Sequence, residues 1–203
     1  MRLFSFLILL FFVQSSNAQI KITNLNVKTL PKSIHYKGIV DHAVKYIDKE
    51  GEHMVITTED DGVKKVDGGD DEKSEDLYAY CYKLNGDQWV LTWQMHDFVN
   101  ECQFDISGGY LPATFAVTDL NKDGKAEVWL VYRLACRSDV SPSDMKVIMH
   151  EGEKKFAMRG GSKVKVNGTD YYGGDYKFDD AFKTGPETFR QYAQQLWKKN
   201  VME

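Results

Sequence analysis

The sequence lacks a second apolar run of membrane-spanning length and any excess of basic residues. After one apolar stretch near the start, no other segment offers the roughly 20 apolar residues that a membrane-spanning helix needs. Lys and Arg number 26 against 30 Asp and Glu, and they form no basic stripe in the sequence. Since nucleic-acid-binding domains typically carry such a stripe, we expect no nucleic acid as a partner and no membrane-spanning segment in the mature protein.

Several motifs of known chemistry are also missing. The chain has no nucleophile elbow, P-loop, dinucleotide-binding glycine pattern or HExxH helix. Its three cysteines do not have the spacing of a zinc site. The sequence therefore names no reaction and no catalytic residue, and we lean towards a protein that is not an enzyme.

The N-terminus has the pattern of a secretory signal peptide. Arg2 precedes an apolar run from Leu3 to Val13, and the small residues Ser16 and Ala18 follow at the positions that a signal peptidase reads. We predict cleavage after Ala18 and a secreted or periplasmic protein. The remaining residues, 19–203, suit a single β-rich domain.

Export permits a disulfide bond between two of the three cysteines. Cys102 and Cys136 both lie in loop-like sequence flanked by acidic residues, so we predict that these two pair. Cys81 lies between two tyrosines in an apolar strand pattern and is predicted to be a buried free thiol.

Alternating apolar residues and turn signals predict about four β-hairpins. A mainly β fold of antiparallel hairpins follows, arranged as a sandwich, an open barrel or a propeller-like sheet, with a C-terminal helix. The predicted strand pairs are 39–47 with 54–58, 77–84 with 89–98, 113–118 with 128–134, and 145–150 with 155–158.

Three segments fall outside the hairpins. Residues 19–37 are expected to form an irregular lead-in, and the charged, glycine-rich segment 59–76 a solvated loop. Residues 186–200 are predicted to form a helix, because Phe189, Ala193, Leu196 and Trp197 fall on one face at helical spacing.

The clearest chemical signal is the acidic loop, which we define as Asp119–Glu127. Asp119, Asn121 and Asp123 occupy positions 1, 3 and 5, a glycine stands at position 6, and Lys125 at position 7 can offer its backbone carbonyl. Calcium prefers such hard oxygen ligands on a tightly curved backbone. Glu127 at position 9 would complete the set. The loop therefore predicts a structural calcium site.

The flanks of this loop distinguish it from an EF-hand, because they have strand patterns and position 12 is Leu130. The segment resembles the nine-residue calcium loop of FG-GAP and integrin-type propeller repeats, D-x-D-x-D-G-x-x-D. It departs from that pattern with Asn at position 3 and Glu at position 9. One copy of about twenty residues implies a local metal site and not the propeller fold.

Two polar clusters flank the same hairpin. If Cys102 and Cys136 pair, the clusters meet and bring Asp97, Asp105 and Asp139 towards one surface, where paired carboxylates could serve acid–base chemistry. The alternative is that these acids cap backbone amides at strand ends and turns.

The order of motifs carries a family resemblance. The chain reads D-F-V-x-x-C-x-x-D (residues 97–105), V-T-D-L-N-K-D-G-K-A-E-V-W-L-V-Y (117–132), C-R-S-D-V-S-P-S-D-M-K-V-I-M (136–149) and K-F-A-M-R-G (155–160). This resembles exported Bacteroidetes proteins described as surface polysaccharide biosynthesis proteins. The resemblance implies a role in making or presenting lipopolysaccharide, but no catalytic residue.

These observations lead to one expected function and two alternatives. We expect an exported, calcium-binding, non-enzymatic binding or assembly factor linked to surface polysaccharide, with envelope polysaccharide or envelope proteins as partners. The first alternative is a glycan-acting enzyme that uses Asp97, Asp105 or Asp139. The second is a secreted inhibitor or an adhesin-like binding module.

Overall fold

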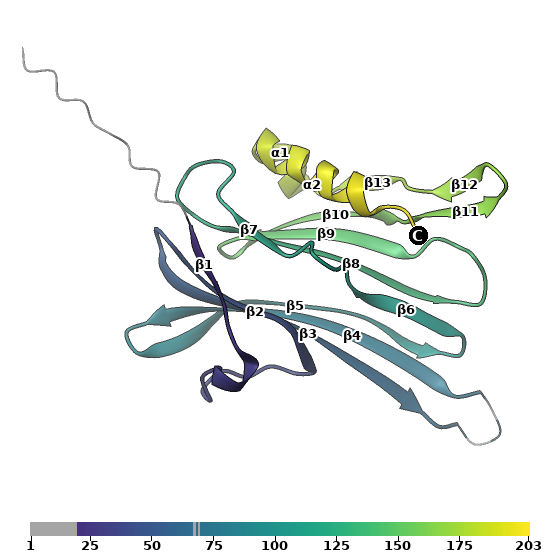
Figure 1. Cartoon of the computed structure of the whole chain (residues 1–203), viewed down its shortest axis with the longest axis horizontal. Coiled ribbons are helices and arrows are strands. Elements are labelled where there is room, and N and C mark those ends of the chain that lie inside the picture. The colour runs from purple at the N-terminus through teal and green to yellow at the C-terminus, as the bar shows by residue number, and fades with distance from the viewer. Residues whose placement is uncertain (1–19, 67, 69) are drawn as a thin grey trace, which may run out of the picture.

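The computed structural model describes residues 20–66, 68 and 70–203. Two antiparallel β-sheets pack face to face, and helices cover the outer side of one of them (Figure 1). The predicted signal peptide, residues 1–18, and the residue that follows its cleavage point, Gln19, lie outside the described residues.

The N-terminal half forms the first sheet, sheet A, as a meander in which each strand pairs with the next one in the chain. Tight turns join β2 to β3 and β4 to β5, and the Asn-Gly signal at residues 85–86 lies at the second of these turns. Within the described residues the strands of sheet A are β1 (Lys21–Asn24), β2 (Ile39–Asp48), β3 (Gly51–Lys64), β4 (Glu72–Asn85) and β5 (Gln88–Cys102).

The C-terminal half forms sheet B, whose strand order is β13-β10-β9-β8-β6, with β7 pairing with the first part of β8. A small separate hairpin consists of β11 and β12. The strands of this half are β6 (Asp105–Tyr110), β7 (Ala116–Thr118), β8 (Glu127–Arg137), β9 (Asp144–Glu151), β10 (Lys154–Gly161), β11 (Lys163–Asn167), β12 (Asp170–Gly173) and β13 (Tyr176–Phe178).

The helices follow at the C-terminus and pack on the outer face of sheet B. A 3-10 turn, η1 (Val27–Thr29), precedes β2, and α1 (Asp180–Thr184) and α2 (Glu187–Asn200) end the chain. The Asp179 carboxylate caps α1 by accepting a hydrogen bond from the Phe182 amide at 2.9 Å. Helix α2 buries Phe189, Ala193 and Trp197 against the sheet.

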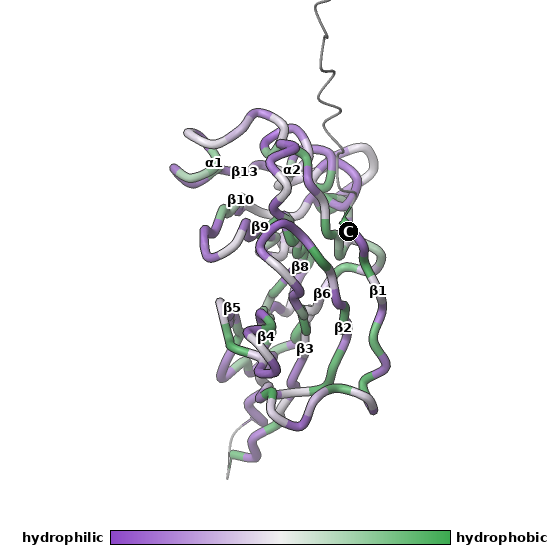
Figure 2. The backbone as a smooth tube through the Cα atoms, turned by 90° about the vertical axis from the view of Figure 1, so that its left-hand side faces the viewer, coloured by the Kyte–Doolittle hydropathy of each residue, from purple (hydrophilic) through white to green (hydrophobic). Residues whose placement is uncertain are grey.

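Side-chain alternation along the strands separates three apolar layers. One face of sheet A meets one face of sheet B in the central core, which includes Val55, Leu77, Leu130 and Ile148. The opposite face of sheet B packs under α1 and α2. The outer face of sheet A is covered by the N-terminal lead-in, which buries Ile34. Figure 2 shows the alternation of hydrophobic and hydrophilic residues along β2.

The structure confirms the mainly β fold, the four hairpin pairings and the C-terminal helix, which begins at Glu187, one residue later than predicted. Two loop predictions were wrong. The lead-in 19–37 contains β1, which pairs with β2, and most of the segment 59–76 continues β3 and β4 as a long two-stranded extension. A two-stranded extension that water surrounds can consist of charged residues. The composition of segment 59–76 therefore did not distinguish such strands from a loop.

None of the described helices is long and apolar enough to cross a membrane.

Candidate functional site at the acidic loop and the adjoining cavity

The acidic loop connects β7 to β8, as predicted, and its short side chains fold the backbone around them. The Gly124 amide donates to Asp119 Oδ2 at 3.1 Å, the Asp123 amide to Asn121 Oδ1 at 3.0 Å, and the Lys125 amide to Asp123 Oδ1 at 2.8 Å. Gly124 has a φ of +84°, a conformation that favours glycine. The loop is therefore tightly curved, with oxygens from positions 1, 3 and 5 held in place.

One oxygen of this loop lacks a partner. Asp119 Oδ1 is buried and accepts no hydrogen bond from any residue that the structure describes. A buried carboxylate oxygen without a donor is costly. The loop therefore leaves an acceptor open at the first position of the predicted calcium site.

Glu127, the predicted ligand at position 9, points into the loop from its far end. It is fully buried, and its carboxylate accepts from the Thr118 hydroxyl at 2.6 Å and from the Leu120 amide at 2.9 and 3.0 Å. Burial raises the pKa of Glu127 and the neighbouring Asp119 raises it further, while those hydrogen bonds oppose the rise. Glu127 thus fastens the two ends of the loop together.

The turn between β2 and β3 docks onto the same loop and so joins sheet A to sheet B. The Lys49 amide donates to the Gly124 carbonyl at 2.9 Å, and the Ala126 amide donates to Asp48 Oδ2 at 3.0 Å. Burial opposes ionisation of Asp48, but the nearby His53 ring and hydrogen bonds from the Ala126 and Glu50 amides outweigh it and hold the pKa of Asp48 below the ordinary value. The ion pair of Lys125 with Glu50 adds a third link.

The side chains of the predicted metal site are not gathered as a ready-made metal centre. Over residues 20–66, 68 and 70–203, no group of three or more His, Cys, Asp or Glu side chains is placed to hold a metal ion. Three of the predicted ligands, Asp119, Asp123 and Glu127, are acids of this kind, so the Asn121 side chain and the Lys125 carbonyl would have to complete the set. The calcium site of this loop, with its mixed ligand set, therefore stays a prediction.

A cavity of about 470 Å³ opens between the two sheets beside this loop. This is within the range of small-ligand sites in proteins. Its inner wall is formed by Tyr46, His53, Cys81 and Trp93, which come from β2, β3, β4 and β5. Charged side chains line the rest of it: Glu50, Lys83, Lys125, Glu151, Glu153 and Lys154. The cavity thus combines aromatic surface with donors and acceptors of both signs.

Glu151 connects the cavity to the loop. Its Oε1 accepts from Asn121 Nδ2 at 2.7 Å while the side chain lines the cavity. Burial raises the pKa of Glu151, and the nearby Asp123 raises it further. The acidic loop therefore forms part of the cavity wall, and a change in the loop would move a group that faces the cavity.

One buried histidine, His53, lines this cavity and a second, His150, packs behind its wall, and both lack hydrogen-bond partners among the described residues. His53 is 5% exposed and stacks on Tyr46, and its Nε2 lies 3.2 Å from Asp48 Oδ1 without the alignment of a hydrogen bond. His150 is 4% exposed and stacks on Trp93 with ring centroids 4.0 Å apart. Neither ring nitrogen of His150 has a partner among the described residues.

Sequence reasoning missed this cavity because two of its wall residues lie in the hairpin of β2 with β3 and two in the hairpin of β4 with β5. A usable signal did exist. Tyr46, His53, Cys81 and Trp93 all occupy inward positions of their strands, and a histidine in such an apolar row is unusual. Only the pairing of β3 with β4, which no tight-turn signal indicated, brings the two hairpins together.

The three carboxylates considered for catalysis have separate partners. Asp97 accepts from the Tyr132 hydroxyl at 2.7 Å and from Lys146. Burial opposes its ionisation, yet these bonds keep its pKa below the ordinary value. Asp139 accepts from the Ser141 hydroxyl and from the Ser141 amide, the latter at 2.9 Å, and both bonds lower the pKa of Asp139. Each of these two acids therefore holds local structure.

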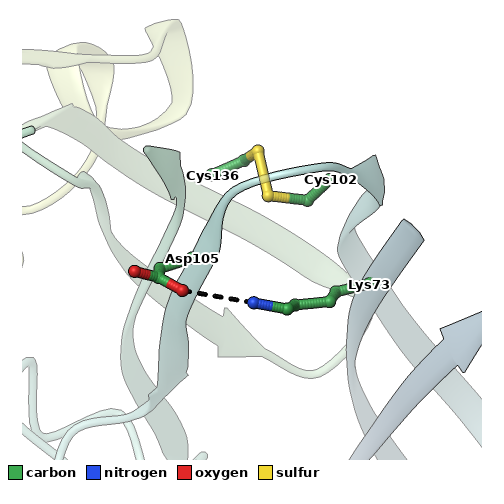
Figure 3. The surroundings of a disulfide bond; sticks show 4 residues. All are labelled: Lys73, Cys102, Asp105 and Cys136. Atoms are coloured by element: carbon green, nitrogen blue, oxygen red, sulfur yellow. Dashed lines mark hydrogen bonds and ion pairs between the residues drawn. A yellow bond between two sulfur atoms is a disulfide. The ribbon is translucent and has the colours of Figure 1, made fainter. Parts of the chain in front are cut away.

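The predicted disulfide is present and joins Cys102, at the end of β5, to Cys136 in β8 (Figure 3). Asp105 lies beside it and pairs with Lys73 at 3.2 Å, with its side chain 90% exposed. Cys81 is a buried free thiol, as predicted. The disulfide thus links the two sheets at the end of β8 opposite to the acidic loop.

Comparison with protein-family models, curated proteins and solved structures gives no match for this chain.

Proposed function

We propose that this protein is an exported, non-enzymatic binding protein of the cell envelope, which takes a segment of surface polysaccharide into the cavity between its sheets. The observation that carries the proposal is the cavity of about 470 Å³ with Tyr46 and Trp93 in its wall and a partly unsatisfied His53 beside them. Tyr46 and Trp93 are nearly buried, with one face each on a histidine, so a sugar ring would pack against the small part of these rings that reaches the cavity. The charged side chains can hydrogen-bond to its hydroxyl groups.

The separate roles of Asp97, Asp105 and Asp139 support binding over glycan hydrolysis. A hydrolase needs two carboxyl groups that flank the scissile bond, one of them a proton donor with a raised pKa. Asp97 and Asp139 instead have lowered pKa values and structural partners. We therefore assign no reaction to this group of acids.

Binding is tested by titrating the protein with oligosaccharides released from the surface polysaccharide of the producing bacterium while tryptophan fluorescence is recorded. We expect a saturable change, which Glu151→Gln weakens at least about fivefold because an ionised acceptor is lost from the cavity. Asp70→Asn is the matched control, since Asp70 is an exposed acid in the connection between β3 and β4. Equal binding by all three proteins would count against the cavity.

We further propose that calcium braces the cavity wall through the acidic loop. Asp119, Asn121 and Asp123 would contribute side-chain oxygens and Lys125 its backbone carbonyl, while Glu127 holds the ends of the loop. The buried, unpartnered Asp119 Oδ1 supports this assignment. These four protein ligands would tie the turns of the loop to one ion, and water would complete the roughly six to eight oxygens that calcium takes.

The calcium proposal is tested by thermal unfolding in 10 mM calcium and in chelator. A site of the strength typical of extracellular modules should add about 1–3 kcal/mol, or several degrees in Tm. Asp123→Ala should abolish the difference, and the control Asp70→Asn should retain it. A wild-type Tm that calcium does not change would sink the proposal.

The link to the envelope has its own test in the producing bacterium. Deletion of the gene should change the lipopolysaccharide profile on a gel, and a copy carrying Glu151→Gln should restore it only in part. An unchanged profile in the deletion strain would remove surface polysaccharide from the proposal and leave the cavity without an assigned ligand.

A further inference from the structure

Four basic side chains gather on β9, β10 and β13 of sheet B, next to β5 at the edge of sheet A. Lys146, Arg159 and Lys177 are direct cross-strand neighbours on β9, β10 and β13, and Lys155 lies four residues before Arg159 on the same face. We call these four residues the cationic row. Lys155, Arg159 and Lys177 are exposed.

The strand register fixes the direction of these side chains. Met158 and Phe178, which neighbour Arg159 and Lys177 in the chain, pack into the core under the helices. Because side chains alternate along a strand, Arg159 and Lys177 point to the opposite face, the one that β8 and β9 use to meet sheet A. On this face Lys155, Arg159 and Lys177 are exposed, whereas Ala157, between the first two, is buried in the central core.

The charges of this row are poorly compensated. Lys146 pairs with Asp97, but across residues 20–66, 68 and 70–203 no carboxylate forms an ion pair with Lys155, Arg159 or Lys177. Burial lowers the pKa of Lys155, and the positive charges of Arg159 and Lys146 lower it further. The carboxylates of Asp97 and Asp179 have the opposite effect and raise it. Like charges on facing strand positions repel and cost stability, so the fold itself does not explain the row.

We propose that the cationic row binds an acidic glycan that carries one anionic group on each sugar. Neighbouring strands are about 4.8 Å apart, so Lys146, Arg159 and Lys177 repeat at a spacing comparable to the length of one sugar ring. An extended chain laid across the strands would place successive anionic groups against successive cations. The row is open and linear, which suits a polymer better than a compact anion.

The inference deepens the proposed function, because it names the class of polysaccharide, but it uses a different surface from the cavity. The two are neighbours, since Lys155 is the cross-strand partner of His150, and His150 stacks on Trp93 in the cavity wall. No residue of the row lines the cavity, so substitutions can test the two surfaces separately.

The test uses fluorescently labelled oligogalacturonate, which has one carboxylate per sugar, and its methyl ester, which has none. Wild-type protein should bind the acid form, with affinity that falls as salt rises, and should bind the ester far more weakly. Arg159→Gln combined with Lys177→Gln should weaken binding of the acid form at least about fivefold. Both side chains are exposed, so the double variant should keep the wild-type Tm.

The matched control is Lys198→Gln combined with Lys199→Gln. These two lysines are exposed on α2, on the other side of sheet B, and their loss changes net charge by the same amount. The control should bind within about twofold of wild type at moderate salt, where distant charges are screened.

An equal loss in both double variants, no binding of the acid form, or equal binding of acid and ester would overturn the proposal. If Glu151→Gln loses binding in the cavity but still binds the acid form through the row, the proposal for the cationic row is supported and the one for the cavity is judged separately.

Discussion

His53 and His150 are both buried. A buried imidazole is stable when it is neutral, or when a partner compensates its charge for the loss of water. His53 faces Asp48, whereas His150 has the flat ring of Trp93 and the cation of Lys155 beside it. Burial, with a smaller effect of Lys155, lowers the pKa of His150 from 6.5 to about 4. A neutral ring between an aromatic face and a lysine therefore marks the place where the core borders the cationic row.

The lowered pKa of His150 predicts how stability depends on pH. The unfolded chain binds a proton near pH 6.5 and the folded protein only near pH 4, so this stabilising contribution is complete above pH 6.5 and is lost as pH falls towards 4. Between pH 7 and pH 4 the wild type should lose up to about 3 kcal/mol more than His150→Phe, which keeps the stacking on Trp93. Urea unfolding at both pH values measures the difference, and equal losses in the two proteins would contradict it.

At the scale of elements, local signals predicted four local hairpins but missed a fifth, that of β11 with β12. The hairpins of β2 with β3 and β4 with β5 are specified by alternation and by turns such as Asn85-Gly86, so their pairing was readable from the sequence. β1, β6 and β13 were missed because they are short strands whose partners lie elsewhere in the chain. The acidic loop was recognised from its spacing, whereas the cavity and the cationic row depend on strand register.

The disulfide is the element-scale link whose contribution can be measured directly. It closes a segment with a sequence separation of 34, for which the chain-entropy model gives about 3–4 kcal/mol of stabilisation. Cys102→Ser combined with Cys136→Ser should lower the free energy of unfolding by roughly that amount in urea.

A thiol count checks the same assignment independently. Native protein should show almost no reactive thiol because Cys81 is buried, unfolded protein should show one, and reduced unfolded protein should show three. Three reactive thiols without reductant would mean that Cys102 and Cys136 do not pair.

On the scale of the whole molecule, the two sheets are joined at opposite ends of β8 by different means. One end has the covalent bond of Cys136, and the other has the turn of β2 and β3 docked on the acidic loop through Asp48 and Lys49. The apolar core lies between them. Asp48 is therefore a contact on which the relative placement of the sheets depends.

Removal of the Asp48 carboxylate tests this dependence. Asp48→Ala leaves the buried Ala126 amide without an acceptor, so we expect it to cost about 2–3 kcal/mol in urea unfolding. Asp87→Ala, in the exposed turn between β4 and β5, should cost no more than about 0.5 kcal/mol. Equal effects of the two substitutions would show that the docked turn does not hold the sheets together.

The two ends of β8 differ in how easily the contacts between the sheets can break. The disulfide cannot open without chemistry, whereas the hydrogen bonds at the β2–β3 turn can break and reform, and the cavity lies at this second end. The end of β8 that carries the acidic loop is therefore the end at which the separation of the sheets can change. Stronger contacts in that loop should hold the cavity between the sheets closer to one width.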